Sequence, residues 1–288
     1  MDKDKRFVWT ALSVMFSSPS NRLWEVMRNY ESAELLYQDI KNGQCAFISD
    51  REAARMQAFT DNQVYAVQKL CDRRGIMILC YDDEAYPERL RHIYCPPAVL
   101  YCRGDVTSLS SKRSVAVIGA RHASDYSMKV AYSYAGVLAK NGVTIISGLA
   151  NGIDAQAHKA AVDAGGITCG VIGCGHEYDY PRGSAQLKGS ICRQGCVISE
   201  YMPNTRPEPE NFKVRNRLIA ALSDIVLVVQ AGERSGTLNT VGHALEQGKE
   251  VLVIPPHDIL CDDYTGQSRL IEDGAVPVYS PAQIIERL

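Results

Sequence analysis

A strand, helix, strand pattern between residues 114 and 150 constrains the fold of this chain more than any other feature. Short apolar, β-branched runs at 115–118 and 143–146 have the length and composition of fully buried strands. Between them, apolar residues recur at helical spacing over 125–140, and Asn141-Gly142 ends that helix. A unit of this kind predicts two parallel strands joined by a right-handed crossover.

The same alternation continues to the end of the chain. Strands are expected at 115–118, 143–146, 167–172, 196–199, 225–230, 250–254 and 276–279. Helices are expected between them, at 125–140, 153–164, 184–194, 214–222, 237–247 and 268–273. Strands that alternate with helices in this way predict an α/β fold built on a doubly wound, mainly parallel sheet.

The N-terminal quarter of the chain has a different texture. Helical spacing occurs throughout residues 1–74 and strand alternation does not, which predicts a small all-helical module. Its expected helices lie at 7–15, after a capping Asn21, at 33–40 and at 57–70. Two further strands, at 77–81 and 96–104, are expected beyond a domain boundary near residue 74, so that 75–288 form the α/β domain.

Composition limits the classes of function. The net charge is -2, so any nucleic-acid site must be a local basic patch. No run reaches the 18 or so apolar residues that span a bilayer, and we expect no membrane association. The ten cysteines are scattered without a Cys-x-x-Cys pair. We interpret them as buried or incidental thiols of a cytoplasmic protein, with metal or disulfide use as the alternatives.

Glycine-containing turns are predicted at the carboxyl edge of the sheet, where ligands of open α/β sheets bind. Four of them combine glycines with small polar residues, at 119–121, 147–152, 173–175 and 232–237. Glycine lets backbone amides approach an anion, and the following helix start adds a favourable dipole. Turn geometry alone explains any one of these turns, whereas four on one edge predict a ligand that carries phosphate.

Nucleotide-binding fingerprints are absent or incomplete. A Gly-x-Gly-x-x-Gly motif does not occur, because Ala120-Arg121 follow Gly119 and Tyr178 stands where a third glycine belongs. Glu200 ends the strand after Gly175, which keeps an NAD site open as an alternative. A phosphate-binding loop with a Lys-Ser or Lys-Thr ending is missing.

A basic segment favours a polyanionic ligand. Residues 206–217 carry four cations and one aromatic ring, namely Arg206, Phe212, Lys213, Arg215 and Arg217. We expect Arg215 and Arg217 to be exposed on the first turn of a helix, a poor place for cations unless an anion compensates them. The alternative is a solvated basic surface. With Tyr178 and Tyr180 as further stacking faces, the segment predicts binding of single-stranded nucleic acid.

Evidence for catalysis is thin. His158 follows Asp154 by four residues on one predicted helix, and such a pair can do acid–base chemistry. The alternative is that the pair caps and orients a loop. We find no other constellation and expect no catalytic residue, no metal site and no cofactor, so the chain is not expected to be an enzyme.

Seven motifs occur in order along the chain. They are Gly119-Ala120-Arg121, Ser147-Gly148-Leu149-Ala150-x-Gly152-Ile153-Asp154-x-x-Ala157-His158, Gly173-x-Gly175 leading to Tyr180-Pro181, Ser199-Glu200-Tyr201, Phe212-x-x-Arg215-Asn216-Arg217-x-Ile219, Ser235-Gly236-Thr237-Leu238-x-Thr240 and Leu270-Ile271-x-x-Gly274-Ala275. Each is weak alone, but the ordered set is specific. Over about residues 75–288 the chain resembles the DNA-processing protein A family, also called DprA or Smf.

The resemblance implies an extended Rossmann-like domain that binds single-stranded DNA, beside a SAM-like helical module. It implies a cytoplasmic, homodimeric recombination mediator without enzymatic activity, which protects incoming DNA and loads RecA during natural transformation, or competence. The DNA-binding residues that it implies are Gly119, Arg121, Ser147, Gly148, Asn151, Gly152, Gly175, Tyr178, Tyr180, Phe212, Lys213, Arg215, Asn216, Arg217, Ser235, Gly236 and Thr237.

The chain departs from the family pattern at several positions. Alanine stands at 120 where serine or threonine is commoner, His176-Glu177 replace Leu-Asp, and Gln267-Ser268 replace Cys-Asn. Because the sequence stops at Leu288, we expect no C-terminal winged helix. The alternative function is a nucleotide-phosphate-binding enzyme or sensor on a related scaffold, since 231–237 partly match its usual loop.

Overall fold

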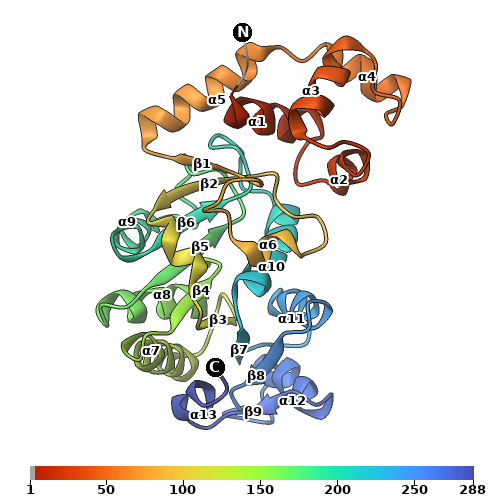
Figure 1. Ribbon diagram of the computed structural model, residues 1–288. Helices are drawn as coiled ribbons and strands as arrows, with labels where there is room; N and C mark the ends of the chain where they lie inside the picture. Colours follow the sequence, from red (N-terminus) through yellow and green to blue (C-terminus); the bar gives the residue numbers. More distant parts are fainter. Residues whose placement is uncertain (1–3) are drawn as a thin grey trace. The chain divides into compact units, whose positions relative to one another are not determined.

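The computed structural model describes residues 4–288, and these residues group into two units (Figure 1). The first unit contains the chain up to Cys102 together with Cys174–Glu177 and Ser199–Thr205. The second contains Arg103–Gly173, Tyr178–Ile198 and Arg206–Leu288. Residues 1–3 of the predicted helical module lie outside the described residues.

The first unit consists of short helices followed by a pair of strands. Its elements are α1 (Lys5–Met15), α2 (Asn21–Met27), α3 (Ala33–Asn42), α4 (Asp50–Gln57), α5 (Asp61–Arg74), β1 (Met77–Cys80), α6 (Glu88–Arg91) and β2 (Val99–Gly104). Strands β1 and β2 pair in antiparallel register, with Leu79 opposite Leu100. The predicted helices at 7–15 and 33–40 and both predicted strands are confirmed.

Two details of the helices differ from the prediction. The expected helix at 57–70 is present as α5, but it begins only at Asp61, because α4 and α5 are separate helices with a break at 58–60. Each begins with a capping box, in which a Ser or Thr and the Glu or Gln three residues later exchange hydrogen bonds with the backbone: Ser49 with Glu52, and Thr60 with Gln63. The cap of α2 is Ser20, and Asn21 is its first helical residue.

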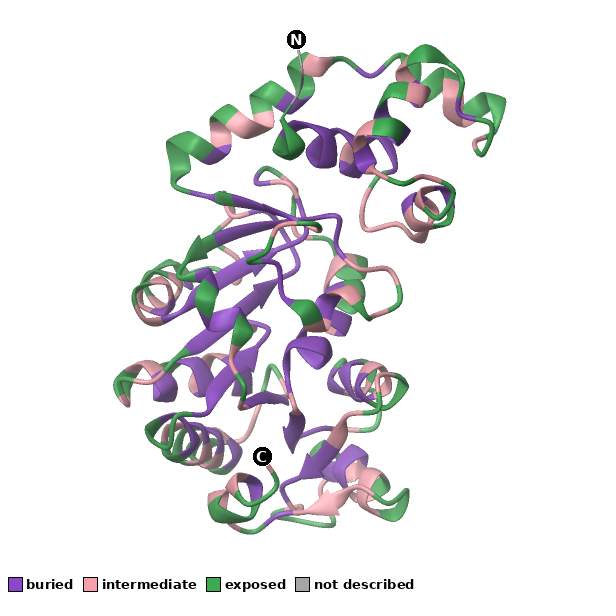
Figure 2. Ribbon diagram, in the orientation of Figure 1, coloured by how far each residue is buried: buried purple, intermediate pink, exposed green. Residues whose placement is uncertain are grey.

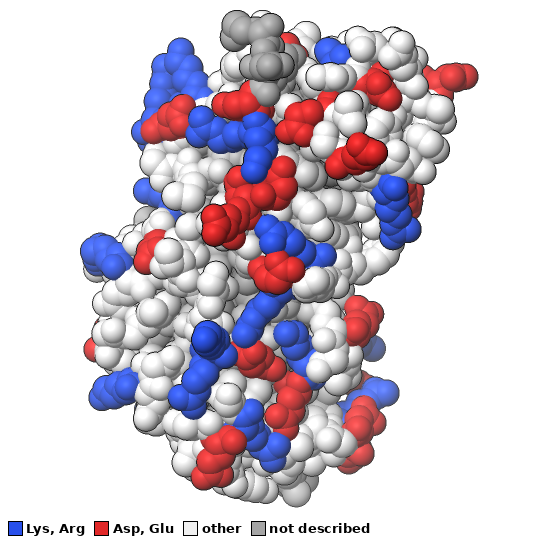
Figure 3. All heavy atoms as spheres, viewed as in Figure 1, with Lys and Arg blue, Asp and Glu red and all other residues white. Residues whose placement is uncertain are grey.

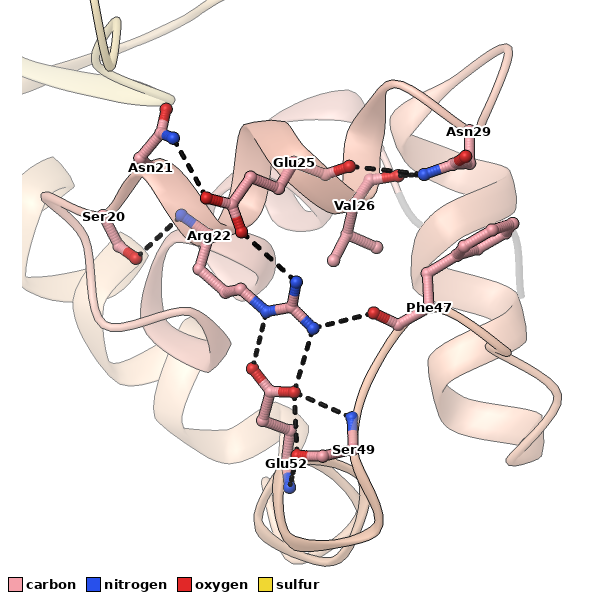
Figure 4. Close-up of polar contacts among 9 residues, drawn as sticks. All are labelled: Ser20, Asn21, Arg22, Glu25, Val26, Asn29, Phe47, Ser49 and Glu52. Atoms are coloured by element: carbon pink, nitrogen blue, oxygen red, sulfur yellow. Dashed lines mark hydrogen bonds and ion pairs between the residues drawn. The ribbon is translucent and has the colours of Figure 1, made fainter.

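An arginine ties α2 to the start of α4 (Figure 4). Arg22 donates to both carboxylate oxygens of Glu52, at 2.8 and 3.1 Å, and to the carbonyl oxygen of Phe47. The same carboxylate accepts a hydrogen bond from the Ser49 amide. The contacts with Arg22 and Ser49 hold the pKa of Glu52 at about 2.

The core of the first unit extends past residue 74. Ile76, Ile78 and Tyr101 are buried in the same cluster as Leu12 and Leu36 of the helices. The helices therefore pack on the strand pair, and the compact unit runs to Cys102 rather than ending at the boundary predicted near residue 74. The reason is that the helices bury only one side of their apolar surface against one another.

The second unit alternates strands and helices as predicted. Its elements are η1 (Val106–Ser110), β3 (Ser114–Gly119), α7 (Asp125–Lys140), β4 (Thr144–Ser147), α8 (Ile153–Asp163), β5 (Thr168–Ile172), α9 (Ala185–Gln194), β6 (Cys196–Ser199), α10 (Pro209–Leu222), β7 (Ile225–Gln230), α11 (Thr237–Glu246), β8 (Glu250–Val253), η2 (Asp262–Tyr264), α12 (Thr265–Glu272), β9 (Val276–Pro277) and α13 (Pro281–Ile285). Two differences are that α10 begins five residues before the expected start and that α13 was not predicted.

The strand order fixes where a ligand can bind. In the second unit the strands lie in the order β6-β5-β4-β3-β7-β8-β9. The chain winds outward from β3 in one direction and from β7 in the other, and β3 pairs with β4 and β7 in parallel register. This confirms the doubly wound, Rossmann-like α/β fold. The switch point lies between β3 and β7, and a crevice opens there in sheets of this type.

Helices cover both faces of this sheet (Figure 1). Helices α7, α8 and α13 share one core with the strands, through residues such as Ala135, Ala160 and Ile284. Helices α10, α11 and α12 lie on the other face. The strands between them are almost entirely buried (Figure 2), as expected for parallel strands covered on both sides. None of the helices in the described residues is long and apolar enough to cross a membrane.

Candidate functional site

A cavity of about 690 Å³ opens at the switch point of the second unit. It is bordered by the ends of β3 and β7, by the turn after β4 and by the first turns of α10 and α11. Ten of the predicted site residues line it: Gly119, Arg121, Tyr180, Phe212, Lys213, Arg215, Asn216, Ser235, Gly236 and Thr237. The structure thus brings together most of the residues that the motifs indicated.

Two aromatic rings form one wall of the cavity. The rings of Tyr180 and Phe212 are stacked, with centroids 5.0 Å apart and planes inclined by 28°. Both side chains are half-buried. A Cβ atom at Gly173 would lie 2.7 Å from Cδ1 of Phe212, so only glycine at this position leaves room for the ring. The wall is therefore built jointly by two of the predicted motifs.

The loop that carries Tyr180 is held by its own polar side chains. The carboxylate of Asp179 accepts hydrogen bonds from the Gly183 amide, at 2.8 Å, and from the Ser184 hydroxyl, at 3.1 Å. Lys188 donates to the carbonyl oxygen of Tyr178 at 2.9 Å. These contacts order the loop before α9 and keep the Tyr180 ring against Phe212.

Two guanidinium groups approach the Phe212 ring. The Cζ atom of Arg121 lies 5.5 Å from the ring centroid, and that of Arg215 lies 5.9 Å from it. Both distances suit cation–π attraction. Arg121 is exposed on the turn after β3, whereas Arg215 is only 4% exposed. Arg121 is therefore accessible to a ligand from solvent, whereas Arg215 forms part of the floor of the cavity.

The prediction that Arg215 and Arg217 are exposed on a first helical turn is wrong. Helix α10 begins at Pro209, which places both arginines in its second and third turns. Arg215 lies four residues before Ile219, so the two share the face turned to the sheet. Its guanidinium donates to the carbonyl oxygens of Gly148, at 2.7 Å, and Val171.

Arg217 is also buried, and it does not line the cavity. Its guanidinium donates to the carbonyl oxygen of Val214 at 3.2 Å. Lys213, one turn earlier, is exposed at the cavity and forms an ion pair of 2.7 Å with Glu210. Of the three predicted cations of this helix, Lys213 alone is accessible to a ligand.

The turn after β4 supports the site from behind. Ser147 donates to the carbonyl oxygen of Val117 at 2.7 Å, and Gly148 is buried next to the Arg215 guanidinium. Gly152 has a φ of 77°, and a Cβ atom there would lie 2.3 Å from the carbonyl oxygen of Ala120. Four predicted residues of this turn are therefore outside the lining: Ser147, Gly148, Asn151 and Gly152.

Asp154 holds this turn in place, and His158 follows it by one turn on α8. The Asp154 carboxylate accepts from the amides of Gly148 and Ala150, at 3.2 and 3.3 Å. Burial raises the pKa of this carboxyl above its ordinary value, while the nearby Arg215 acts in the opposite direction. His158 shares a 2.7 Å hydrogen bond with Thr168, and burial lowers the pKa of its imidazole to about 3. Asp154 thus bonds the loop, as the alternative to acid–base chemistry expects, whereas His158 bonds a residue of β5.

Two other predicted residues lie elsewhere. Gly175 belongs to the first unit, where its amide donates to the carbonyl oxygen of Thr205 at 2.8 Å. A Cβ atom at this glycine would lie 2.1 Å from the carbonyl oxygen of Pro203, which explains the glycine by packing. Tyr178 is half-buried in the second unit and does not line the cavity.

Sequence analysis missed two cavity residues. Arg234 and His122 are both exposed and line the opening. Arg234 stands inside the glycine turn at 232–237, a signal that was present in the sequence. In the same turn the Ser235 hydroxyl accepts from the Thr237 amide at 3.2 Å, so Ser235 bonds the first residue of α11, whose N-cap is Gly236.

The glycine turn after β7 is fastened by a buried amide. Gln267 donates to the carbonyl oxygens of Val229 and Ile254, at 2.9 and 2.6 Å, and accepts from the Ala231 amide at 3.2 Å. This residue departs from the family pattern, yet its side chain satisfies three backbone groups at once. The departure therefore preserves the position of the turn.

Charges of both signs are interspersed on the face of the molecule in Figure 3, in line with the net charge of -2. The cavity differs, because Arg121, Lys213, Arg215 and Arg234 line it together with a single carboxylate, Asp154. The fold and this cavity define a Rossmann-like protein that presents cations and stacked aromatic rings at its switch point.

Known proteins of one family resemble the chain. The family model for DNA recombination-mediator protein A matches residues 77–288. DNA processing protein DprA of Bacillus subtilis is 40% identical over 216 residues, which cover 75% of this chain and 72% of that protein. Protein Smf of Escherichia coli is 37% identical over 239 residues, covering 83% of this chain and 63% of that protein. The chain belongs to the DNA recombination-mediator protein A family.

Solved structures agree with this assignment. DprA of Streptococcus pneumoniae superposes with a TM-score of 0.85 at 30% identity, covering 99% of this chain and 98% of that chain. DNA processing protein A of Helicobacter pylori, described for its unique single-stranded DNA binding mode, superposes with a TM-score of 0.66 at 30% identity. That match covers 73% of this chain and 95% of the other.

Proposed function

We propose that the cavity of the second unit binds single-stranded DNA. The observation that carries the proposal is the stacked Tyr180–Phe212 pair beside the exposed cations Arg121, Lys213 and Arg234. Proteins that bind single strands combine a cationic surface for the backbone with aromatic faces for the bases. The relative from Helicobacter pylori, described for its single-stranded DNA binding mode, supports the same ligand class.

Selectivity for single strands follows from the aromatic wall. A base can stack on the Tyr180 and Phe212 rings only when one of its faces is no longer stacked on a neighbouring base. In a duplex this exposure costs unstacking and unpairing, whereas a single strand offers its bases directly. The cavity volume of about 690 Å³ suits a few nucleotide groups rather than a duplex.

The wider role that we propose is that of a recombination mediator. The chain would protect incoming single strands and load RecA onto them during natural transformation, acting as a cytoplasmic homodimer. Support comes from the family, whose members are named for DNA processing and recombination mediation. We also propose that the chain is not an enzyme, because the Asp154 carboxylate is bonded to the amides of a buried turn and His158 is bonded to Thr168 of β5.

A binding assay with unstructured oligonucleotides tests the proposal. Arg121→Glu and Lys213→Glu should each weaken binding of a dT oligonucleotide at least about tenfold, because each replaces a phosphate-attracting charge by a repelling one. The matched control is Lys140→Glu, since Lys140 is exposed at the end of α7, on the opposite edge of the sheet. Equal affinity in all three variants and the wild type would reject this site.

The alternative function is tested beside it. Incubation with nucleoside monophosphates should give no hydrolysis product, and Asp154→Asn should change nothing in this assay. Product release that depends on Asp154 would instead support a nucleotide-phosphate enzyme.

A further inference from the structure

Two exposed aromatic side chains lie next to the proposed site and have no part in it so far. The rings of Tyr126 and His257 are in contact, with centroids 4.4 Å apart and planes inclined by 51°. Tyr126 is 46% exposed, and His257 is also exposed. Tyr126 is the second residue of α7, and it follows the cavity residues Arg121 and His122 by only a few positions.

This pair is held firmly from below. The ring of Tyr264, which is 5% exposed, lies 6.3 Å from the His257 ring at an inclination of 29°. The Tyr264 hydroxyl shares a 2.8 Å hydrogen bond with Ser124, whose amide donates to the side chain of Gln230 at 2.9 Å. Gln230 is the last residue of β7. The pair is therefore anchored to the strand end that borders the cavity.

A carboxylate stands next to each residue of the pair in the chain, and these two carboxylates disfavour a phosphate group. Asp125 and Asp258 are exposed neighbours of the two aromatic residues in the chain. The carboxylate of Asp258 accepts from the Leu260 amide at 2.9 Å, which keeps it in the loop. These carboxylates repel phosphate, while the rings offer apolar faces. The arrangement suits the flat face of a base whose phosphates stay near Arg121 and His122.

We propose that Tyr126 and His257 form a second stacking site for a base of single-stranded DNA that leaves the cavity past His122. The inference rests on the proposed function, because it extends the path of the same strand. Every base has an aromatic face, so the site would accept any sequence. Its contribution would be insensitive to salt, since stacking neutralises no phosphate.

An oligonucleotide length series tests this inference. Tyr126→Ala should weaken binding of a strand of about 16 nucleotides by about 5- to 100-fold, and leave a strand of about 4 nucleotides that fills the cavity unchanged. The slope of log affinity against log salt should stay at the wild-type value. Arg121→Ala, in contrast, should reduce that slope by about 0.7.

Three further variants make the result specific. His257→Ala should reproduce the length-dependent loss, and Tyr126→Phe should retain wild-type affinity because the ring remains. Tyr132→Ala is the matched control: Tyr132 lies on the same helix, is 38% exposed and donates to Asp163. It should bind both strands as the wild type does.

The outcomes separate this inference from the proposed function. Wild-type affinity of Tyr126→Ala for the long strand, or an equal loss for both lengths, would overturn the second stacking site alone. A wild-type protein that binds neither strand would overturn the proposed function and the inference with it.

Discussion

Arg121 and Arg215 both lie over the ring of Phe212, but they differ in burial and in their partners. Arg215 forms part of the floor of the cavity, and Arg121 lies at its exposed rim. Arg215 is buried beside Phe212 and donates to backbone carbonyl oxygens of Gly148, in the turn after β4, and of Val171 in β5. Arg121 is exposed on the turn after β3, at a similar distance from the ring. The first charge holds protein segments together, and the second remains available to a ligand. The burial and the partners of a charged residue in a binding motif therefore have to be known before a role is assigned to it.

A third arginine, Arg22, is partly exposed like Arg121 but has fixed protein partners like Arg215. Arg22 in the first unit is 38% exposed and is paired with Glu52 at 2.8 Å (Figure 4). Exposed pairs of this kind contribute at most about 1 kcal/mol to stability. The guanidinium group is the same in all three residues, so burial and partners decide what it does.

The largest expected effect concerns the floor. Arg215→Ala removes the guanidinium beside the buried Asp154 carboxyl and the donors to Gly148 and Val171. Loss of one partner of a buried charge pair lowers the free energy of unfolding by about 3–5 kcal/mol. Chemical denaturation measures this value, with Arg121→Ala as the control, expected within about 0.5 kcal/mol of wild type. A stable Arg215→Ala protein would contradict the distinction between floor and rim.

The next effect concerns the ring between the two arginines. Phe212→Ala removes the stacking partner of Tyr180, and we expect the binding free energy for single-stranded DNA to weaken by about 1–3 kcal/mol. Fluorescence anisotropy with a labelled oligonucleotide measures it. Phe212→Tyr keeps an aromatic face and should bind nearly as the wild type does; equal loss in both variants would show that the ring does not stack a base.

The exposed cation Arg121 at the rim is expected to affect the salt dependence of DNA binding. Arg121→Ala should lower the slope of log affinity against log salt by about 0.7, the value for one phosphate contact with a single strand. The corresponding test at Lys140, which is exposed at the far end of α7, should leave the slope unchanged. If both variants change the slope equally, Arg121 contributes no more to phosphate binding than a cation outside the cavity does.

A smaller gain is expected when a rim cation loses its internal partner. Lys213 pairs with Glu210 at 2.7 Å on the exposed surface of α10. Glu210→Gln should strengthen binding of single-stranded DNA by up to about 1 kcal/mol, because a repelling carboxylate is removed and Lys213 is released. Weaker binding of this variant would mean that the ion pair positions Lys213 for the ligand.

The smallest effect concerns Arg22 and Glu52. The pKa of Glu52 is about 2 in the folded chain and near 4.5 when the carboxyl is unperturbed. The stabilisation from this pair is therefore complete above about pH 4.5 and is lost as the pH falls toward 2. Urea unfolding across this range should show a loss of less than about 1 kcal/mol that is absent from Glu52→Gln. Identical pH profiles would show that the pair adds nothing.

Local patterns were sufficient to predict the strands and most helices. The apolar runs at 115–118 and 225–230 could only be buried strands, and the structure has them at Ser114–Gly119 and Ile225–Gln230. The four glycine turns were also predicted at the correct edge of the sheet. These features depend on a few neighbouring residues, whose spacing and turn chemistry are visible in the sequence.

The burial of Arg215 could not be predicted from the assumed helix start. The expected helix begins at residue 214, although Pro209 is well suited to the first position of a helix. With the correct start, Arg215 falls on the same stripe as Ile219 and Leu222, and its burial follows. The split at 58–60 was missed for a similar reason, because the cap at Thr60 was overlooked.

Other differences depend on contacts between segments far apart in the chain. Gly175 fits a phosphate-binding turn by its neighbours, but its packing against Pro203 is visible only in the folded structure. Asp154 likewise caps a turn whose floor is completed by a residue 61 positions later, Arg215. The sequence motifs contained these residues, and only the fold showed which distant segments they contact.

The central claim is that exposed cations and stacked rings at the switch point grip a single strand. The most direct measurement is the affinity of the wild-type protein for single-stranded and double-stranded DNA of equal length across a series of salt concentrations. The account predicts tighter binding of the single strand at every salt concentration, with affinity that falls as salt rises. Equal affinity for both forms, or single-strand affinity that is independent of salt, would contradict it.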